Sequence, residues 1–311
     1  MKKKSREDMN EKKLFTPVKK EELGIKEFVR PSVGYWKDAW RRLKKNKLAM
    51  VGLVMIISLL LFAVLGPQLS AYKYDQTELT NCYASMSKTH LFGTDAIGRD
   101  VFTRVAFGAR ISLAVGFVAA FISFFIGVFY GGISGFIGGK TDNIMMRIVD
   151  IFYSIPVLLI VILLMVVLRP GLGNVFIALG IAYWVGMARI VRGQVLSLKE
   201  QEFTLAARAL GASKRRILTK HLIPNTMGPI IVTATLLIPN AIFFEAFLSF
   251  IGLGVSAPMA SWGVLASDGI QGFRSYPNLL FIPAIFISIT MLSFNFLGDG
   301  LRDALDPRLR K

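Results

Sequence analysis

The sequence predicts an all-α membrane protein that crosses the bilayer six times. Of its 311 residues, 53% are hydrophobic, and they cluster in long runs. Each run is about 20 residues long, the length that an α-helix needs to cross a hydrocarbon core of roughly 30 Å. We place the six spans at residues 48–66, 111–133, 144–168, 173–190, 229–252 and 278–298.

The distribution of Lys and Arg predicts which side of the membrane each loop faces. Residues 1–47 contain 16 of the 37 basic residues, and the segment 191–227 contains 7. The loops at 67–109 and 253–277 contain 4 and 1. Because cytoplasmic loops are enriched in Lys and Arg, we expect both termini and the 191–227 segment to be cytoplasmic. The net charge of +17 then reflects topology and attraction to anionic lipids, not nucleic-acid binding.

The segment before the first span divides into a tail and a helix. Residues 1–35 are rich in Lys and Glu and predict a disordered cytoplasmic tail. In residues 36–47, apolar side chains at helical spacing alternate with basic ones, which predicts an amphipathic helix at the membrane interface. The first long apolar run begins near Leu48, too far along the chain for a cleavable signal peptide. The single Cys82 excludes an internal disulfide and a cysteine metal cluster.

Residues 67–110 form the predicted extracytoplasmic loop after the first span. Near its end, four charged residues recur at helical spacing, so that their charges can pair beside the membrane. They are Asp95, Arg99, Asp100 and Arg104.

Glycines mark the end of the second span. Gly127, Gly131, Gly135 and Gly139 recur every four residues, a spacing that permits close helix packing in lipid. The tripeptide that begins at Gly139 resembles a phosphate-binding loop, but Ser134 stands where that motif requires glycine. We therefore expect any ATP to be bound by other subunits.

The polar, basic segment between the fourth and fifth spans predicts a helix, a tight turn and a second helix. Apolar residues at helical spacing give the first helix one apolar face. Gly211 suits its C-terminus, Ser213 suits the start of the second helix, and Pro224 is expected to end that helix. An alternative interpretation is an amphipathic helix that rests on lipid headgroups. The apolar face comprises Phe203, Ala206, Ala207 and Leu210, beside Thr204 and Arg208.

Several residues stand out because polar or helix-breaking groups are costly in a membrane span. Glu245 is expected to face protein or a water-filled path, or to tie two helices together. Pro156 and Pro239 permit kinks in the third and fifth spans. Asp150 is expected to be neutralised by Arg147, one turn away. In the outer loop, Trp262 suits a membrane interface, and in the basic segment His221 is expected to brace the loop against the spans.

The segment Glu202–Asn225 resembles the cytoplasmic EAA loop of ABC-importer permeases. Ala206 and Ala207 are followed at the family's spacing by Gly211 and Pro224, although Leu205 replaces the leading Glu and His221 replaces the usual Ile. The segments around WKDAWRRLKKNKLAMVGL, HLFGTDAIGRDVFTRVAFGARISL and GDGLRDALDPRLRK resemble the peptide-transporting branch. The resemblance covers about residues 36–311.

This resemblance implies the type I ABC importer permease fold, with a core permease domain at 111–298, a coupling loop at 199–225 and a cytoplasmic tail at 299–311. It also implies a non-catalytic permease, the second transmembrane subunit of an oligopeptide importer in the bacterial cell membrane. The ATPase-coupling set implied is Glu202, Phe203, Ala206, Ala207, Arg208, Leu210, Gly211, Ala212, His221 and Pro224. We expect Glu245, Pro239, Trp262 and Asp150 to lie at the pathway or at the interface between permeases.

The partners implied are a homologous second permease, two ATP-binding subunits that hold ATP and Mg²⁺, an extracytoplasmic peptide-binding protein, the peptide and membrane lipids. No cofactor or metal is expected on this chain. One alternative keeps the class but changes the cargo to dipeptides, nickel chelates or another small solute. A second alternative is a lipid-binding membrane scaffold or channel.

Overall fold

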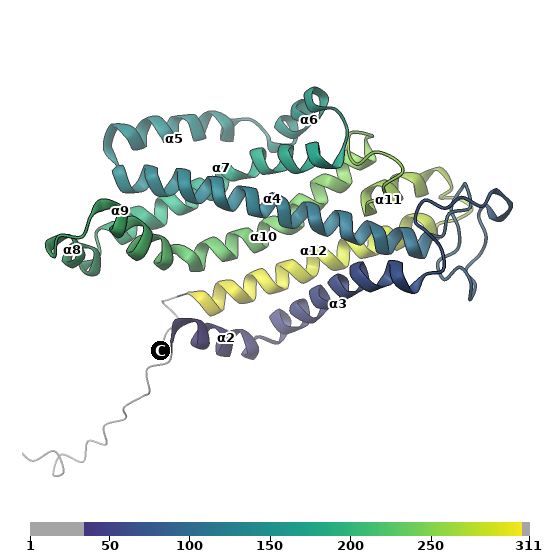
Figure 1. Ribbon diagram of the computed structural model, residues 1–311, viewed down its shortest axis with the longest axis horizontal. Helices are drawn as coiled ribbons and strands as arrows, with labels where there is room; N and C mark the ends of the chain where they lie inside the picture. Colours follow the sequence, from purple (N-terminus) through teal and green to yellow (C-terminus); the bar gives the residue numbers. More distant parts are fainter. Residues whose placement is uncertain (1–33, 307–311) are drawn as a thin grey trace, which may run out of the picture. The chain divides into compact units, whose positions relative to one another are not determined.

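A computed structural model describes residues 34–306, which form helices joined by loops. Five helices are long and apolar enough to span a membrane, and a bent helix pair makes a sixth candidate. The predicted tail at 1–35 lies almost entirely outside the described residues. The α-helices, labelled in Figure 1, are α2 (Tyr35–Lys45), α3 (Lys47–Leu69), α4 (Val101–Ile137), α5 (Gly139–Ser154), α6 (Val157–Leu168), α7 (Leu172–Lys199), α8 (Glu202–Ala209), α9 (Lys214–Arg216), α10 (Ile223–Phe250), α11 (Trp262–Gln271) and α12 (Asn278–Leu305). A short 3₁₀ helix, η1 (Leu79–Asn81), lies between α3 and α4, and a π-helical segment, η2 (Ile217–Leu222), lies between α9 and α10.

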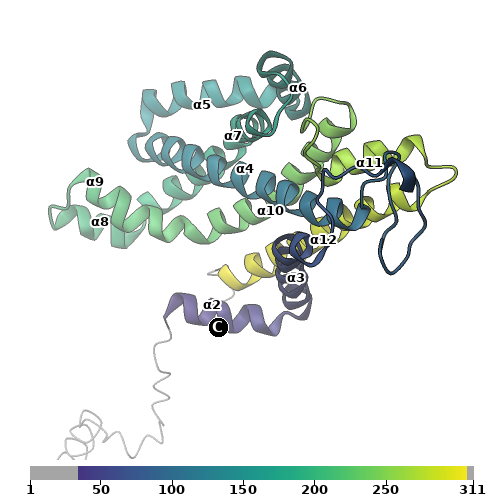
Figure 2. The same ribbon diagram turned by 45° about the vertical axis from the view of Figure 1, so that its right-hand side comes forward.

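The long helices α3, α4, α7, α10 and α12 run beside one another. The helices α8 and α9 lie at one end of this bundle, and α11 lies with the 70–100 loop at the other (Figure 1). We call these the α8 end and the α11 end. Figure 2 shows α3 and α12 on one side of α4, with α5 and α6 on the opposite side.

The amphipathic helix predicted before the first span is α2. Trp40 is 46% exposed, whereas Leu43 is buried and packs with Ala49 and Ala304. Asn46 separates α2 from α3 and caps α3, because its side-chain oxygen accepts a hydrogen bond from the Ala49 amide at 3.2 Å.

The helix α4 begins at Val101, ten residues before the predicted span, and contains 37 residues. At about 1.5 Å per residue it is roughly 55 Å long, which exceeds a hydrocarbon core of about 30 Å. Its extra turns carry Arg104 and Arg110, whose charges obscured the helix in the sequence. Both have partners, since Arg104 donates to Asp95 at 2.8 Å and Arg110 donates to the Ala63 carbonyl oxygen at 2.5 Å.

Arg110 on α4 replaces a hydrogen-bond donor that a proline removes from α3. Pro67 lies inside α3 and has no N–H to donate to the carbonyl of Ala63, four residues earlier. The guanidinium of Arg110 supplies the missing donor and also donates to the Val64 carbonyl at 2.9 Å. The proline and the arginine together join α3 to α4.

Glycines bring α4 and α7 into close contact, as their four-residue spacing predicted. A Cβ on Gly127 would overlap Met187, and one on Gly131 would overlap the Ala188 carbonyl oxygen. A Cβ on Gly135 would lie 2.9 Å from the Arg192 carbonyl oxygen. Gly139 is not part of this contact, because nothing lies within 4 Å of a Cβ placed there.

The predicted third span is broken. The helices α5 and α6 meet at an angle of 86°, at the point where Pro156 caps α6. Proline allows the break because it has no N–H to continue the helical hydrogen bonds. By contrast, Pro239 lies inside α10, which continues from Ile223 to Phe250.

A buried carboxylate joins α4, α10 and α11. Glu245 is fully buried and accepts hydrogen bonds from Ser112 on α4 at 3.1 Å and from Ser249 at 2.8 Å. Ser112 also accepts the backbone N–H of Trp262 at 3.2 Å. The Trp262 indole donates to the Val105 carbonyl at 3.0 Å and is fully buried, so the prediction of a membrane-interface anchor is wrong. The indole satisfies its N–H inside the protein, where Gly108 leaves room for it.

Replacement of Gly131 by Ala tests the contact between α4 and α7. The added methyl group would overlap the Ala188 carbonyl, and overpacking of this kind costs about 1–3 kcal/mol. We expect a lower Tm for the purified complex in detergent. The control is Gly173→Ala, since a Cβ at Gly173 meets nothing within 4 Å. Equal melting of the two variants would show that the helices do not approach as described.

Replacement of Glu245 distinguishes a helix tie from a place at the transport pathway, which the family resemblance implies. Glu245→Ala should lower the Tm, because each buried hydroxyl that loses its acceptor costs about 1–3 kcal/mol. Glu245→Gln keeps the size and one acceptor oxygen, and the serine hydroxyls can rotate, so we expect near-normal Tm and uptake. A Gln variant that melts normally yet fails in transport would contradict a purely structural role.

Candidate functional site

Two side chains on the inner side of α8 hold the loop at the α8 end to the bundle. Thr204 is fully buried, and its hydroxyl donates to the Leu198 carbonyl at the end of α7 at 2.8 Å. Ala207, one turn later, is buried and packs in a cluster with Ile217 and Leu222. These contacts fix α8 against the segment that follows it.

The turn after α8 has the predicted geometry. Gly211 adopts a φ of +79°, a conformation that favours glycine, and its N–H donates to the Arg208 carbonyl at 3.0 Å. The Ala212 N–H donates to the Ala207 carbonyl at 3.0 Å. Ser213 then caps the next helix by accepting the Arg216 N–H at 3.3 Å.

The outer side of α8 and its turn carries an exposed apolar surface. Leu210 is 88% exposed, Phe203 is 41% exposed, and Leu205 is 45% exposed. Of the four predicted apolar residues, Ala207 faces inward and the other three face outward. Leu205 joins them, although sequence reasoning noted it only as a replacement for Glu. We call this the α8 surface, and it comprises Glu202, Phe203, Leu205, Ala206, Arg208, Leu210 and Gly211.

The segment after the turn does not end at Pro224, so that prediction is wrong. Helical structure continues from Lys214 through the π-helical residues Ile217–Leu222 into α10. Pro224 lies directly after the π-helical segment, as the second residue of α10, and the helical path continues through it. His221 is partly buried in the π-helical segment, and its carbonyl accepts the Asn225 side-chain amide at 2.6 Å.

An ion pair that the sequence did not predict joins α5 and α7 near this loop. Arg192 on α7 makes two hydrogen bonds to Asp142 on α5, both at 2.6 Å. Ser134 on α4 donates to the same carboxylate at 2.5 Å. The pair joins three helices, and such two-bond pairing fixes orientation as well as distance.

Asp150 pairs with Arg189 on α7, not with Arg147. The guanidinium of Arg189 also lies 3.9 Å from the centre of the Tyr153 ring. Both charged side chains are partly exposed. Arg147 lies three residues before Asp150 on the same helix, and that spacing does not predict a partner on another helix.

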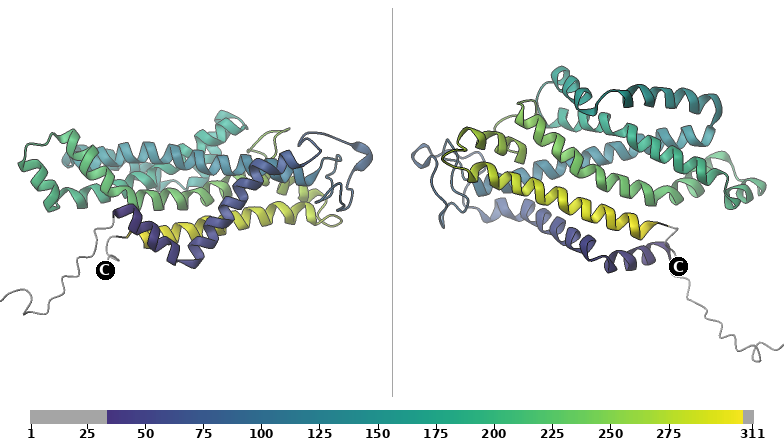
Figure 3. Two further views of the ribbon diagram at one scale, coloured as in Figure 1. Left: turned by 60° about the horizontal axis from the view of Figure 1, so that its bottom comes forward. Right: turned by 180° about the vertical axis from the view of Figure 1, so that it is seen from behind.

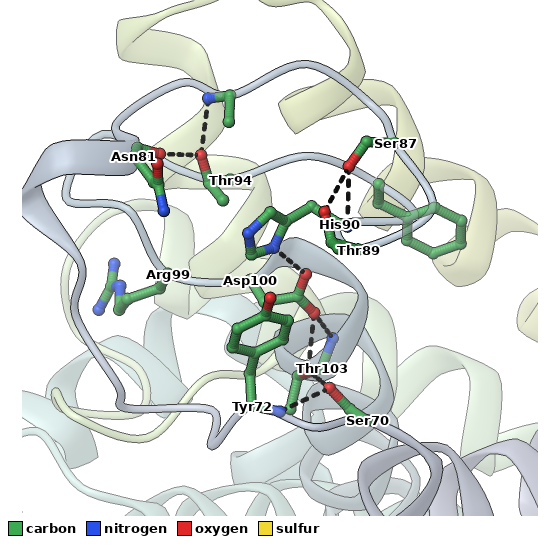
Figure 4. Close-up of polar contacts among 12 residues, drawn as sticks. Ser70, Tyr72, Asn81, Ser87, Thr89, His90, Thr94, Arg99, Asp100 and Thr103 are labelled. Atoms are coloured by element: carbon green, nitrogen blue, oxygen red, sulfur yellow. Dashed lines mark hydrogen bonds and ion pairs between the residues drawn. The ribbon is translucent and has the colours of Figure 1, made fainter.

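The α11 end contains a second polar network, shown in Figure 4. The carboxylate of Asp100 caps α4 by accepting the Thr103 N–H at 2.8 Å, and it lies 2.9 Å from His90 Nδ1. Tyr72 stacks on the His90 ring, with centroids 4.6 Å apart. The Thr103 hydroxyl donates to Asp100, so Ser70 donates its own hydroxyl to Thr103 at 2.5 Å. Asp100 therefore pairs with His90 and not with Arg104.

Arg104 is buried between two acidic side chains. Asp95 accepts from it and from Arg99, at 2.8 and 2.7 Å. Asp268 on α11 lies 3.4 Å from the Arg104 guanidinium. Burial raises the pKa of the Asp268 carboxyl above its usual value, although Arg99 lowers it. These contacts tie the 70–100 loop to α4 and α11.

Comparison with protein families matches most of the chain. A family described as binding-protein-dependent transport system inner membrane component matches residues 124–311. A second, the N-terminal TM domain of oligopeptide transport permease C, matches residues 34–85. The fold also resembles the inward-facing MetNI methionine ABC transporter, with a TM-score of 0.51, 22% identity, and coverage of 64% of this chain and 94% of that chain.

Individual relatives align over nearly the full length. The oligopeptide transport system permease protein OppC of Bacillus subtilis (strain 168) is 55% identical over 96% of this chain and 98% of its own. The dipeptide transport system permease protein DppC of the same organism is 58% identical over 91% and 88%. OppC of Escherichia coli (strain K12) is 49% identical over 88% and 92%. With the apolar spans and the helical fold, these matches establish that the chain belongs to the family of binding-protein-dependent transport system inner membrane components.

Proposed function

We propose that this chain is the membrane-spanning permease subunit of an ATP-driven oligopeptide importer. It forms half of the translocation pathway and receives the motion of an ATPase subunit through the α8 surface. The observation that carries the proposal is Leu210, an 88% exposed leucine on a turn that is held rigidly from within. The alignment to an OppC protein over 96% of this chain and 98% of that relative supports oligopeptides as the cargo.

The α8 surface suits a protein partner better than lipid headgroups. Ala206 and Gly211 are small and exposed, which lets a partner approach the backbone closely. The helix is fixed beneath by Thr204 and Ala207, so a force applied to it is transmitted and not absorbed by bending. Burial of an exposed leucine or phenylalanine against a partner removes apolar area from water, which contributes about 1.5–3 kcal/mol for each fully buried side chain.

In this proposal, each end of the bundle faces one side of the membrane and binds different partners there. The α8 end is cytoplasmic, as are both termini, and the α11 end faces outward in a bacterial cell membrane. Two ATP-binding subunits hold ATP and Mg²⁺ on the cytoplasmic side. A homologous permease completes the pathway, and an extracytoplasmic peptide-binding protein delivers peptide to the α11 end. The 58% identity to a DppC protein makes dipeptides the second candidate cargo.

Replacement of Leu210 by Asp tests the docking surface. A carboxylate in an apolar pocket opposes binding, and loss of a central apolar contact costs about 2 kcal/mol or more, a roughly 30-fold weaker association. We expect the ATPase subunits to be lost from the purified complex and peptide uptake to fall in parallel. Ala207 is less suitable for this test because it is buried.

Leu79→Asp is the matched control, because Leu79 is 73% exposed and lies in η1 at the opposite end. It should leave ATPase binding unchanged. If Leu210→Asp retains both the ATPase subunits and uptake, the α8 surface does not couple them.

A further inference from the structure

The helices α7, α10 and α12 line a cavity near the α8 end, and we call this cavity, together with the face of α10 that continues from it to Asn240, the groove. Figure 3 shows these three helices in succession from behind. The cavity has a volume of about 480 Å³. Its lining residues from α7 and α10 include Gln194, Pro229 and Thr233, and those from α12 include Arg302 and Asp306.

The floor of the groove carries polar groups toward the middle of the membrane. Asn240 lies seven residues after Thr233, so both lie on one face of α10, about 10 Å apart along its axis. Asn240 is exposed. Its side-chain amide donates to the Leu236 carbonyl at 2.9 Å, while its side-chain oxygen accepts no hydrogen bond from residues 34–306. An amide in contact with hydrocarbon is costly, so this face favours water or polar cargo.

The wall that α7 forms has open space beside it. On α7, Gly186 and Gly193 lie one turn before and one turn after Ile190, which lines the cavity. A Cβ at either glycine would meet nothing within 4 Å. Gln194 follows, and within the described part of the chain its amide forms no hydrogen bond.

Other exposed faces of the spans have a different composition. The outward side chains of α3 and α6 are aliphatic, as expected for contact with lipid. Ser58 on α3 and Thr233 on α10 both donate their hydroxyls within their own helices, to the Val54 and Pro229 carbonyls at 2.9 and 2.8 Å, so Thr233 offers a hydrogen-bond acceptor only. The aliphatic side chains are Val51, Val54, Ile57, Leu61, Val64 and Leu65 on α3, and Leu159, Leu163, Val166 and Val167 on α6.

We infer that this groove is the wall that the chain contributes to the peptide conduit, and that Gln194, Thr233 and Asn240 offer hydrogen bonds to the peptide main chain. The inference rests on the proposed import of peptides. Uncharged amide and hydroxyl groups match the main-chain N–H and C=O groups that all peptides share. They do not select among side chains. The charged residues of the lining, Arg302 and Asp306, lie at the α8 end.

The single cysteine makes a direct test of water access possible. In a Cys82→Ser background, Thr233→Cys and Asn240→Cys place thiols on the groove floor. Val54→Cys and Leu163→Cys place thiols on lipid-facing helices as matched controls, since these side chains are 58% and 64% exposed. The full transporter, in inside-out vesicles, is treated with a charged, membrane-impermeant thiosulfonate. We expect the groove thiols to react at least tenfold faster than the controls, and more slowly with a transported peptide present.

Each outcome bears on a separate part of the inference. If the Asn240→Cys thiol reacts as slowly as the Val54→Cys thiol, the groove faces lipid or a covering helix, and the inference is wrong whatever the cargo. If the groove thiols react fast but peptide does not protect them while uptake is normal, the assigned contact with the main chain is wrong. If peptide uptake itself is absent, the proposed function fails, even where fast labelling shows that the groove holds water.

In uptake assays, Asn240→Gln keeps the amide and Asn240→Leu removes it. We expect the Leu variant to raise the KM for several unrelated peptides by a similar factor, while the Gln variant remains near normal. An effect confined to one peptide sequence, or equal loss in both variants, would contradict main-chain recognition by Asn240.

Discussion

The close backbone contact between α4 and α7 is the constraint on which the other helices depend. Gly127, Gly131 and Gly135 leave no room for a side chain, so the two helices are fixed in depth and rotation as well as in distance. In the next turns of these helices, Arg192 pairs with Asp142 and adds α5 to the contact. The end of α7 that leads into α8 is thereby held in a defined place.

The loop connects α7, a wall of the groove, with α10, its floor. Thr204 ties α8 to the end of α7, and the helical path from Lys214 leads without a break into α10. A displacement of α8 therefore acts on α7 and α10 together. In the proposed importer, this is how closure of the ATPase subunits would change the width of the conduit without contact between the nucleotide and the peptide.

Features that depend on neighbouring residues in the sequence could be predicted, and those that depend on other helices could not. The span positions, the positive φ of Gly211 and the cap at Ser213 follow from local composition and geometry. The partner of Asp150 and the burial of Trp262 depend on side chains far away in the sequence. Pro224 was misread because a proline usually ends a helix, whereas here the π-helical residues before it let the helical path continue. The α8 surface was predicted largely by the resemblance of its motif.

The bend between α5 and α6 has a consequence for the isolated chain. Ser154, Ile155 and Pro156 are exposed at the point where the helical hydrogen bonds are interrupted. Hydrocarbon cannot solvate the carbonyl groups left at such a corner, so water, headgroups or another polypeptide must lie beside it. A permease made without its companions would have to thin the surrounding bilayer or hydrate that corner. The thickness of the bilayer should therefore affect the stability of the permease more strongly before it assembles with its partners than afterwards.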